Sequence, residues 1–207
     1  MIAIVDYGVG NLFSLRSSFS AIEADAVVTS DPAVIRSADK IVLPGVGAFS
    51  AAVEKLKESG LYPIVIEEAK SGKPLLGICL GMQMLFERSF EDGVFKGLSL
   101  LAGEVRPIAE VIPKDYKIPH IGWNALHFEK DSPLFKYIKE GDHVYFVHSY
   151  YAAGCESSLT ASAEYGAPLT ACVQKGNIFG CQFHPEKSGE VGLNILRAFV
   201  ELEGGKE

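Results

Sequence analysis

Cys79 has the flanking residues of a catalytic nucleophile. The stretch 77–81 reads Gly-Ile-Cys-Leu-Gly, between an apolar run and a segment with helical periodicity. Glycines two before and two after the cysteine are typical of a nucleophile elbow, a strand-to-helix turn too tight for side chains. The turn would place the thiol at a helix N-terminus, where the helix dipole favours the thiolate. The alternative interpretation is an inert buried cysteine between unrelated glycines.

A base and a group to orient it follow late in the chain. His184-Pro185-Glu186 comes directly after a strand-like run. In extended backbone, residues two apart point to the same side, so the imidazole and the carboxylate can meet. A carboxylate beside an imidazole fixes its tautomer and stabilises the imidazolium. Alone, His-Pro-Glu could be a surface turn, but together with Cys79 it predicts a catalytic triad for acyl transfer.

Acyl transfer also needs hydrogen-bond donors for an oxyanion. Pro44-Gly45-Val46-Gly47 follows one apolar run and precedes a helical stripe. The N–H of Val46 or Gly47, together with the N–H of Leu80, could supply these donors. Sites in parallel α/β sheets gather at the carboxyl ends of the strands, which favours a meeting of this loop with Cys79. Taken in isolation, the loop could equally be an ordinary β–α turn.

No cofactor and no metal site are predicted. Gly8-Val9-Gly10 lacks the third glycine of a dinucleotide-binding fingerprint, because Phe13 stands in that place. The remaining histidines, His120 and His148 among them, have no paired metal-ligand spacing and are expected to be structural.

The elements that must position these residues alternate between strand and helix in the first half of the chain. Apolar runs at 2–5, 40–43 and 75–78 predict buried parallel strands. Helical stripes follow them, and the helix after Cys79 is expected to begin with Met82–Glu87.

The second half of the chain has a different pattern. From about residue 104 strands dominate, including one expected over His143–Tyr151, and a helix over Val191–Leu202 follows them. The whole pattern predicts an α/β fold: a three-layer, flavodoxin-like domain with a mixed, largely parallel central sheet and a β-rich C-terminal half. We expect residues 1–207 to form this single domain.

Composition argues against several functional classes. The net charge of the 207 residues is −7 and no block of Lys and Arg is present, so a nucleic-acid partner is not expected. The longest apolar stretch, Pro74–Phe86, is shorter than the ~20 residues that cross a bilayer, so no membrane association is expected. Four cysteines without a visible signal peptide predict reduced thiols and a cytoplasmic protein.

These motifs resemble those of the class I, or triad, glutamine amidotransferases. The resemblance covers essentially the whole chain. Within that family it is closest to the glutaminase subunits of imidazole glycerol phosphate synthase, an enzyme of histidine biosynthesis. The stretches that favour this subfamily are Asp6–Asn11, Gly-Met-Gln at 81–83 and Lys187-Ser188.

The resemblance implies a glutaminase reaction. Cys79 would attack the side-chain amide of glutamine, giving a thioester and releasing ammonia. His184 would protonate the leaving amine and later activate water, and Glu186 would orient His184. The residues implied to hold glutamine are Gln83, Glu91, Ser149 and Tyr150.

The resemblance also implies a heterodimer with a cyclase subunit built as a (β/α)8 barrel. Ammonia would pass to that subunit, which makes imidazole glycerol phosphate and an aminoimidazole carboxamide ribotide. The positions implied to face the cyclase are Tyr7, Asn11, Trp123 and Lys187. A glutaminase that worked alone would waste glutamine, so we hypothesise that the loop 45–47 is misaligned in the isolated chain and that partner and ligand binding bias it.

Three other functions stay open from the sequence. One is a glutaminase subunit of another triad amidotransferase, for example one serving pyridoxal phosphate or aminobenzoate synthesis. The second is a stand-alone cysteine hydrolase of glutamyl substrates, which should be active without a partner. The third is a non-catalytic interaction subunit, although no triad member or oxyanion glycine is missing.

Overall fold

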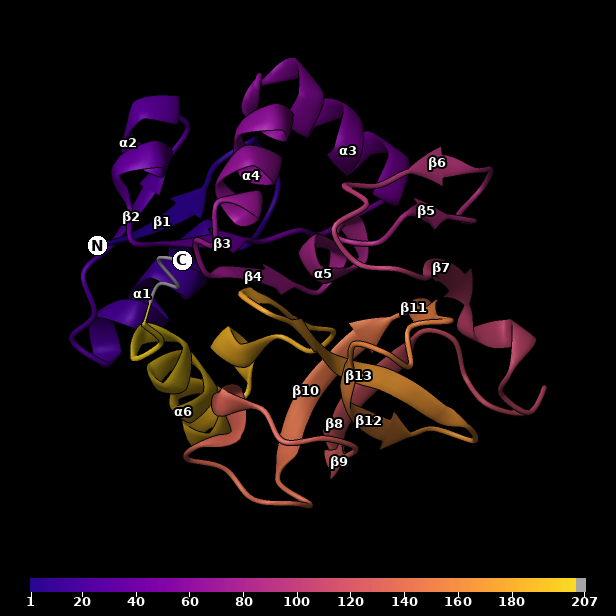
Figure 1. Ribbon diagram of the computed structural model, residues 1–207. Coiled ribbons are helices and arrows are strands. Elements are labelled where there is room, and N and C mark those ends of the chain that lie inside the picture. Colours follow the sequence, from indigo (N-terminus) through magenta and orange to yellow (C-terminus); the bar gives the residue numbers. More distant parts are fainter. Residues whose placement is uncertain (204–207) are drawn as a thin grey trace.

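An eight-stranded mixed sheet forms the centre of the computed structural model, which describes residues 1–203 (Figure 1). Its strand order is β2-β1-β3-β4-β14-β13-β12-β9. The first five strands run parallel to one another, and the remaining three each pair antiparallel with the strand before them, which confirms a mixed, largely parallel sheet. In that order the strands span Ala26–Thr29, Ile2–Val5, Lys40–Leu43, Leu75–Ile78, Ile178–Cys181, Pro168–Lys175, Leu159–Glu164 and His127–Phe128.

Helices cover both faces of the parallel part of the sheet, so the layers are those expected from the sequence (Figure 1). One face carries α2 (Pro32–Ser37), α3 (Phe49–Glu58) and α4 (Leu61–Lys70), and the other carries α1 (Leu12–Ala21) and α6 (Gly189–Val200). Successive strand residues point to opposite faces, so β1 contributes to two separate apolar cores.

Capping signals in the sequence fix where helices begin and end. Before α2, the side chain of Asp31 accepts a hydrogen bond from the Ala33 N–H at 2.8 Å, and Pro32 takes the first helical position. Gly60, with φ 75°, separates α3 from α4 in the left-handed conformation that glycine adopts without strain.

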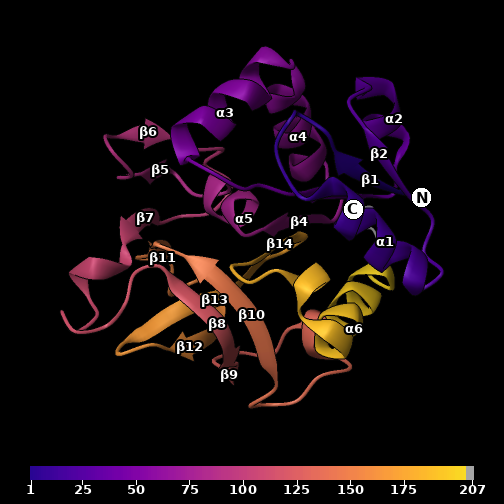
Figure 2. The ribbon, with the colours of Figure 1, turned by 180° about the vertical axis from the view of Figure 1, so that it is seen from behind.

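Two smaller sheets lie beside the central one, near α5 and β14 (Figure 2). A two-stranded antiparallel ribbon pairs β8 (His120–Ala125) with β10 (His143–His148). A four-stranded sheet has the order β11-β7-β5-β6. These strands span Tyr150–Ala153, Glu104–Pro107, Arg88–Ser89 and Phe95–Lys96. Short 3₁₀ helices occupy Ile108–Glu110, Pro133–Phe135 and Pro185–Lys187.

The prediction of one strand over His143–Tyr151 is wrong. The chain breaks at Ser149, so that β10 pairs with β8 whereas β11 pairs with β7 in another sheet. The carbonyl of Ser149 accepts a hydrogen bond from the Ile108 N–H at 3.0 Å, which fixes the break. Strand-favouring tyrosines resume directly after His148-Ser149, so the sequence alone does not separate the two strands.

The boundaries predicted for the helix after Cys79 are also wrong. This helix, α5, spans Leu80–Met84, whereas it was expected to begin with Met82–Glu87 and continue beyond. It starts directly at the elbow, and it ends early because the carbonyls of Met84 and Leu85 accept hydrogen bonds from the N–H groups of Leu98 and Leu100. A later segment thus takes the acceptors that another helical turn would have used.

Edge strand β2 has no counterpart among the sequence predictions. Its four residues, Ala-Val-Val-Thr, are short and only half-buried at the edge of the sheet, although their β-branched side chains favour a strand. No helix within residues 1–203 is long and apolar enough to cross a membrane.

Candidate active site

The strand-to-helix turn at Cys79 has the conformation that its glycine spacing predicts. Cys79 joins β4 to α5 with φ 54° and ψ −113°, a backbone region costly for a residue with a side chain. A Cβ atom on Gly77 would lie 2.8 Å from the carbonyl oxygen of Gly81, and one on Gly45 would lie 2.7 Å from the Gly81 nitrogen. Only glycine therefore lets the three backbone segments approach this closely.

His184 and Glu186 meet as the sequence predicts. Nδ1 of His184 donates to Oε1 of Glu186 at 2.8 Å, and both side chains are buried. His184 has extended backbone and Pro185 starts a 3₁₀ turn, which brings the carboxylate back toward the ring. Ser188 anchors this turn, because its hydroxyl donates to the carbonyl of His184 at 2.6 Å and accepts from the N–H of Tyr145 at 2.9 Å.

The surroundings of His184 favour its charged form. Burial disfavours the imidazolium, but hydrogen bonds with Cys79 and Glu186 outweigh that cost and raise the pKa of His184 to about 9. Since Nδ1 is bonded to Glu186, Nε2 is the ring nitrogen left to act on Cys79. The arrangement is that of a nucleophile, a base and an orienting carboxylate.

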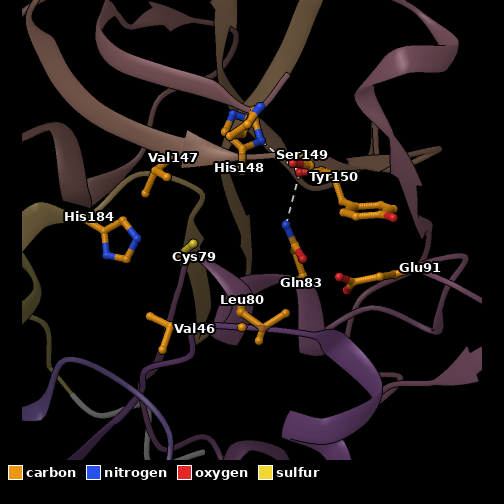
Figure 3. Close-up of a pocket in the computed structure, with 12 residues that line it drawn as sticks. Val46, Cys79, Leu80, Gln83, Glu91, Val147, His148, Ser149, Tyr150 and His184 are labelled. Atoms are coloured by element: carbon orange, nitrogen blue, oxygen red, sulfur yellow. Dashed lines mark hydrogen bonds between the residues drawn. The ribbon is translucent and has the colours of Figure 1, made fainter. Parts of the chain in front are cut away.

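Cys79 lies at the floor of a pocket of about 310 Å³, within the range of small-ligand sites (Figure 3). The sequence-predicted residues that line it are Val46, Gly47, Cys79, Leu80, Gln83, Glu91, Ser149, Tyr150 and His184. They come from separate segments of the chain. The fold therefore brings Cys79 and His184 to one pocket, together with all the oxyanion and substrate positions expected from the sequence. Glu186 does not line the pocket but is hydrogen-bonded to His184.

Gln83 and Glu91 lie on the side of Cys79 away from His184 (Figure 3). Nε2 of Gln83 donates to the Tyr150 carbonyl at 3.1 Å and to Oε1 of Gln182 at 3.0 Å. Both amide hydrogens are therefore engaged, which leaves Oε1 of Gln83 as an acceptor. Oε2 of Glu91 accepts from the Phe49 N–H at 2.8 Å, and burial raises the pKa of this carboxyl. This end of the pocket offers acceptors that suit an ammonium group.

The loop predicted to hold the oxyanion borders the pocket. Val46 and Gly47 are exposed at its rim, and Gly47 has φ 89°. Leu80 is the first residue of α5, so its N–H has no acceptor within the helix. Backbone N–H groups at such a place can face a developing negative charge.

The positions expected to face a partner do not share one environment. Trp123 is 56% exposed and packs edge-on against the ring of Tyr145. Nζ of Lys187 lies 5.9 Å from the centre of the Tyr145 ring. Asn11 is half-buried at the start of α1. Tyr7 is only 4% exposed, so its side chain offers little surface to a partner. Its hydroxyl donates inward to the Pro44 carbonyl at 2.7 Å and supports the oxyanion loop instead.

Several residues of the site were not predicted from the sequence, and Pro119 and Val147 of the pocket lining are among them. Nε2 of Gln182 points to Sγ of Cys79 at 3.7 Å, and His148 lines the pocket although it was expected to be structural. Gln182 stands two residues before His184, so alternation along an extended segment could have placed both on one side. For His148, the signal is the stretch His148-Ser149-Tyr150, which belongs to the resemblance but was not read as marking the histidine itself.

The family model described as "Glutamine amidotransferase class-I" matches residues 3–202 of the chain. Curated relatives match along nearly their whole length, and several are named "Imidazole glycerol phosphate synthase subunit HisH". The protein of this name from Caldanaerobacter subterraneus is 49% identical, with 98% of each chain covered. The one from Bacillus licheniformis is 50% identical, with 98% of this chain and 96% of the relative covered.

Solved structures share the fold at low sequence identity. One described as a glutamine amidotransferase has a TM-score of 0.75 and 17% identity, and the match covers 97% of this chain and 98% of that one. A chain in the structure of PurLQS from Thermotoga maritima has a TM-score of 0.68 and 19% identity, with 96% of each chain covered. This likeness supports the α/β architecture independently of the close relatives.

Proposed function

The chain belongs to the class-I glutamine amidotransferase family, and on that premise we propose that it is the glutaminase subunit of an imidazole glycerol phosphate synthase. It hydrolyses glutamine to glutamate and supplies the ammonia to a cyclase subunit in histidine biosynthesis. The observation that carries the chemistry is the position of Cys79 and His184 at one pocket of small-molecule size, with Nδ1 of His184 bonded to Glu186 at 2.8 Å.

The triad performs two acyl transfers. The thiolate of Cys79 attacks the amide carbon of glutamine, and the imidazolium of His184 gives its proton to the departing nitrogen as the C–N bond breaks. Neutral His184 then takes a proton from water, whose oxygen attacks the thioester and releases glutamate. Glu186 holds Nδ1 throughout, so Nε2 always faces the reacting atoms.

Other pocket residues bind the substrate and stabilise the charge that develops. The N–H of Leu80 and that of Val46 or Gly47 face the oxyanion of the tetrahedral intermediate. Oε1 of Gln83 and the carboxylate of Glu91 accept from the α-ammonium of glutamine, and the backbone at Ser149 and Tyr150 borders it.

The partner is a cyclase subunit that we expect to be a (β/α)8 barrel, docked over Trp123, Lys187 and Asn11. Ammonia released into neutral water is protonated and stops being a nucleophile, so a closed interface preserves it. The glycines of loop 45–47 permit a peptide flip, and docking of the cyclase with its ligand would select the orientation that completes the oxyanion hole. Buried free thiols such as Cys172 suit the reducing cytoplasm, where we place the complex.

The test is ammonia release from glutamine by the purified chain, alone and with the cyclase subunit plus its ribulosyl-phosphate ligand. We expect almost no ammonia release from the chain alone and a large increase in the complex. Full glutaminase activity without the cyclase would indicate a stand-alone hydrolase. No ammonia release under either condition would indicate a non-catalytic subunit. Cys79→Ala should abolish ammonia release and leave cyclase binding nearly unchanged, and retained activity in this variant would overturn the proposal.

A further inference from the structure

Two buried histidines, His120 on β8 and His148 on β10, form a contact that the triad chemistry does not use. Nδ1 of His120 lies 2.9 Å from Nε2 of His148, and the residues are 3% and 6% exposed. We call these two residues the histidine pair. They face each other across the antiparallel ribbon, and the ring of His120 stacks between those of Phe146 and Tyr165. Polar groups this deeply buried need hydrogen-bond partners, so the pair's partners indicate its role.

The direction of each hydrogen bond in the pair can be deduced from one carbonyl. The oxygen of Tyr150 only accepts, so Nδ1 of His148 donates to it at 2.8 Å. A neutral imidazole carries a single N–H, so Nε2 of His148 accepts and Nδ1 of His120 donates. Nε2 of His120 is then an acceptor, 3.4 Å from the amide nitrogen of Asn124.

Both rings must be neutral for this pattern. A protonated His148 would carry a hydrogen on Nε2 and could not accept there, and a protonated His120 would direct a second N–H at the amide nitrogen of Asn124. Burial lowers the pKa of His120 and of His148 to about 4. At neutral pH each ring therefore has one donor and one acceptor, as the pattern requires.

The pattern continues from the histidine pair to the nucleophile. The Tyr150 carbonyl accepts a second bond, from Nε2 of Gln83 at 3.1 Å, and the other hydrogen of Nε2 goes to Oε1 of Gln182 at 3.0 Å. With its oxygen occupied in this way, Gln182 presents its NH₂ group to Sγ of Cys79 at 3.7 Å. Figure 3 shows His148, Tyr150 and Gln83 following one another into the pocket.

We propose that the histidine pair positions the glutamine-binding end of the pocket. The pair holds the Tyr150 carbonyl, and that carbonyl fixes which end of the Gln83 amide faces glutamine. The two histidines are positioning residues, since they act through Tyr150 and Gln83. This inference rests on the proposed glutaminase function, because it concerns the binding of that substrate.

Loss of the δ-position donor on either histidine would free this end of the pocket. The Tyr150 peptide could then rotate, and the Gln83 amide could flip so that its NH₂ group replaces Oε1 toward the substrate ammonium. Glutamine binding would weaken while the triad remained assembled. The expected signature is therefore a higher KM for glutamine with a smaller change in kcat.

The test compares asparagine and glutamine at each position, in the complex of this chain with the ligand-bound cyclase. Asparagine places an amide nitrogen where Nδ1 stood, whereas glutamine carries its amide one bond further out. We expect His120→Asn and His148→Asn to keep KM for glutamine near the wild-type value. We expect His120→Gln and His148→Gln to raise it about tenfold, as the loss of a buried hydrogen bond implies.

A purely structural role predicts the opposite order, because glutamine is closer in size to histidine than asparagine is. The thermal midpoint of each variant is measured alongside KM to separate the two effects. Equal KM values within each Asn/Gln pair, or better function of the Gln variants, would overturn the inference. If the wild-type complex itself released no ammonia, the proposed function would fail instead, so the two failures are distinguishable.

Discussion

At the scale of single residues, the hydrogen bond from His184 to Glu186 controls how the base is charged. The carboxylate accepts from Nδ1 at 2.8 Å and lies almost wholly out of water, with its side chain 3% exposed. It contributes to the raised pKa of His184 and selects the tautomer that faces Cys79.

Glu186→Gln should therefore lower both the activity and the pKa of His184. A neutral amide no longer stabilises the imidazolium, so the titration midpoint of the His184 ring should fall from about 9 toward 6.5, followed by NMR of the ring protons. Glutamine hydrolysis in the complex should fall by about 10²–10⁴-fold, the usual contribution of acid–base catalysis. Glu190→Gln, on the exposed start of α6, is the matched control and should change neither. An unshifted His184 titration in Glu186→Gln would contradict this account.

At the scale of elements, β4, α5 and the loop after β3 approach each other closely and thereby fix the position of Cys79. The site depends on glycines at three positions where a Cβ would meet backbone atoms: Gly45, Gly77 and Gly81. Tyr7 adds support from the end of β1 by holding the Pro44 carbonyl.

Gly77→Ala should destabilise the fold and displace the elbow. Its Cβ would lie 2.8 Å from the Met82 nitrogen, and backbone cannot move away as a flexible side chain can. Overpacking of this kind costs about 1–3 kcal/mol, which a lower urea midpoint would report. Gly176→Asn is a suitable control, because Gly176 has φ 56° with open space around it and asparagine tolerates that conformation. An unchanged midpoint and full glutaminase activity in Gly77→Ala would contradict the role assigned to this glycine.

At the scale of the whole molecule, the histidine pair links the site to the pH dependence of stability. Its folded-state pKa values, about 4, lie below the ordinary value of 6.5. The unfolded chain therefore takes up protons first as the pH falls. The stability due to the neutral pair is present above about pH 6.5 and is lost as the pH falls toward 4.

In the double variant His120→Asn, His148→Asn, the free energy of unfolding should fall less steeply between pH 6.5 and 4 than in the wild type. Urea unfolding at a series of pH values from 7 to 4 would compare its unfolding free energy with that of the wild type. We expect one cooperative transition for both proteins, because the two cores pack on the same sheet. Carboxylates titrate in both proteins, so only the difference between the two curves reports the pair. Parallel curves would show that the histidines do not titrate as their burial implies.

The partner surface is the second property of the whole molecule. Trp123 is 56% exposed beside Tyr145 and Lys187, and a large exposed aromatic is the kind of side chain that anchors an interface. Trp123→Ala should weaken cyclase binding about 10- to 100-fold, measured by calorimetry. Val94→Ala, at an exposed position between β5 and β6, should leave binding unchanged. If both variants bound the cyclase with equal affinity, Trp123 would not be part of the interface.

The sequence by itself determined the parts of this protein whose cause is local. The Gly-x-Cys-x-Gly spacing specifies the elbow, Asp31-Pro32 specifies a helix start, and short apolar runs specify the buried strands of the sheet. His184 and Glu186 also follow from local geometry, since their contact spans only two residues. The elbow, the His184–Glu186 contact and the layered α/β architecture were predictable for this reason.

Only the tertiary structure decided what depends on segments that are distant in the chain. The break at Ser149, the early end of α5 and the burial of Tyr7 each result from hydrogen bonds to residues more than ten positions away. The same holds for the chain of contacts from the histidine pair to Cys79, in which Gln83 and Gln182 are 99 residues apart. Local sequence patterns reflect backbone preference and burial, whereas the pairing of particular donors and acceptors is set by packing, which no local pattern records.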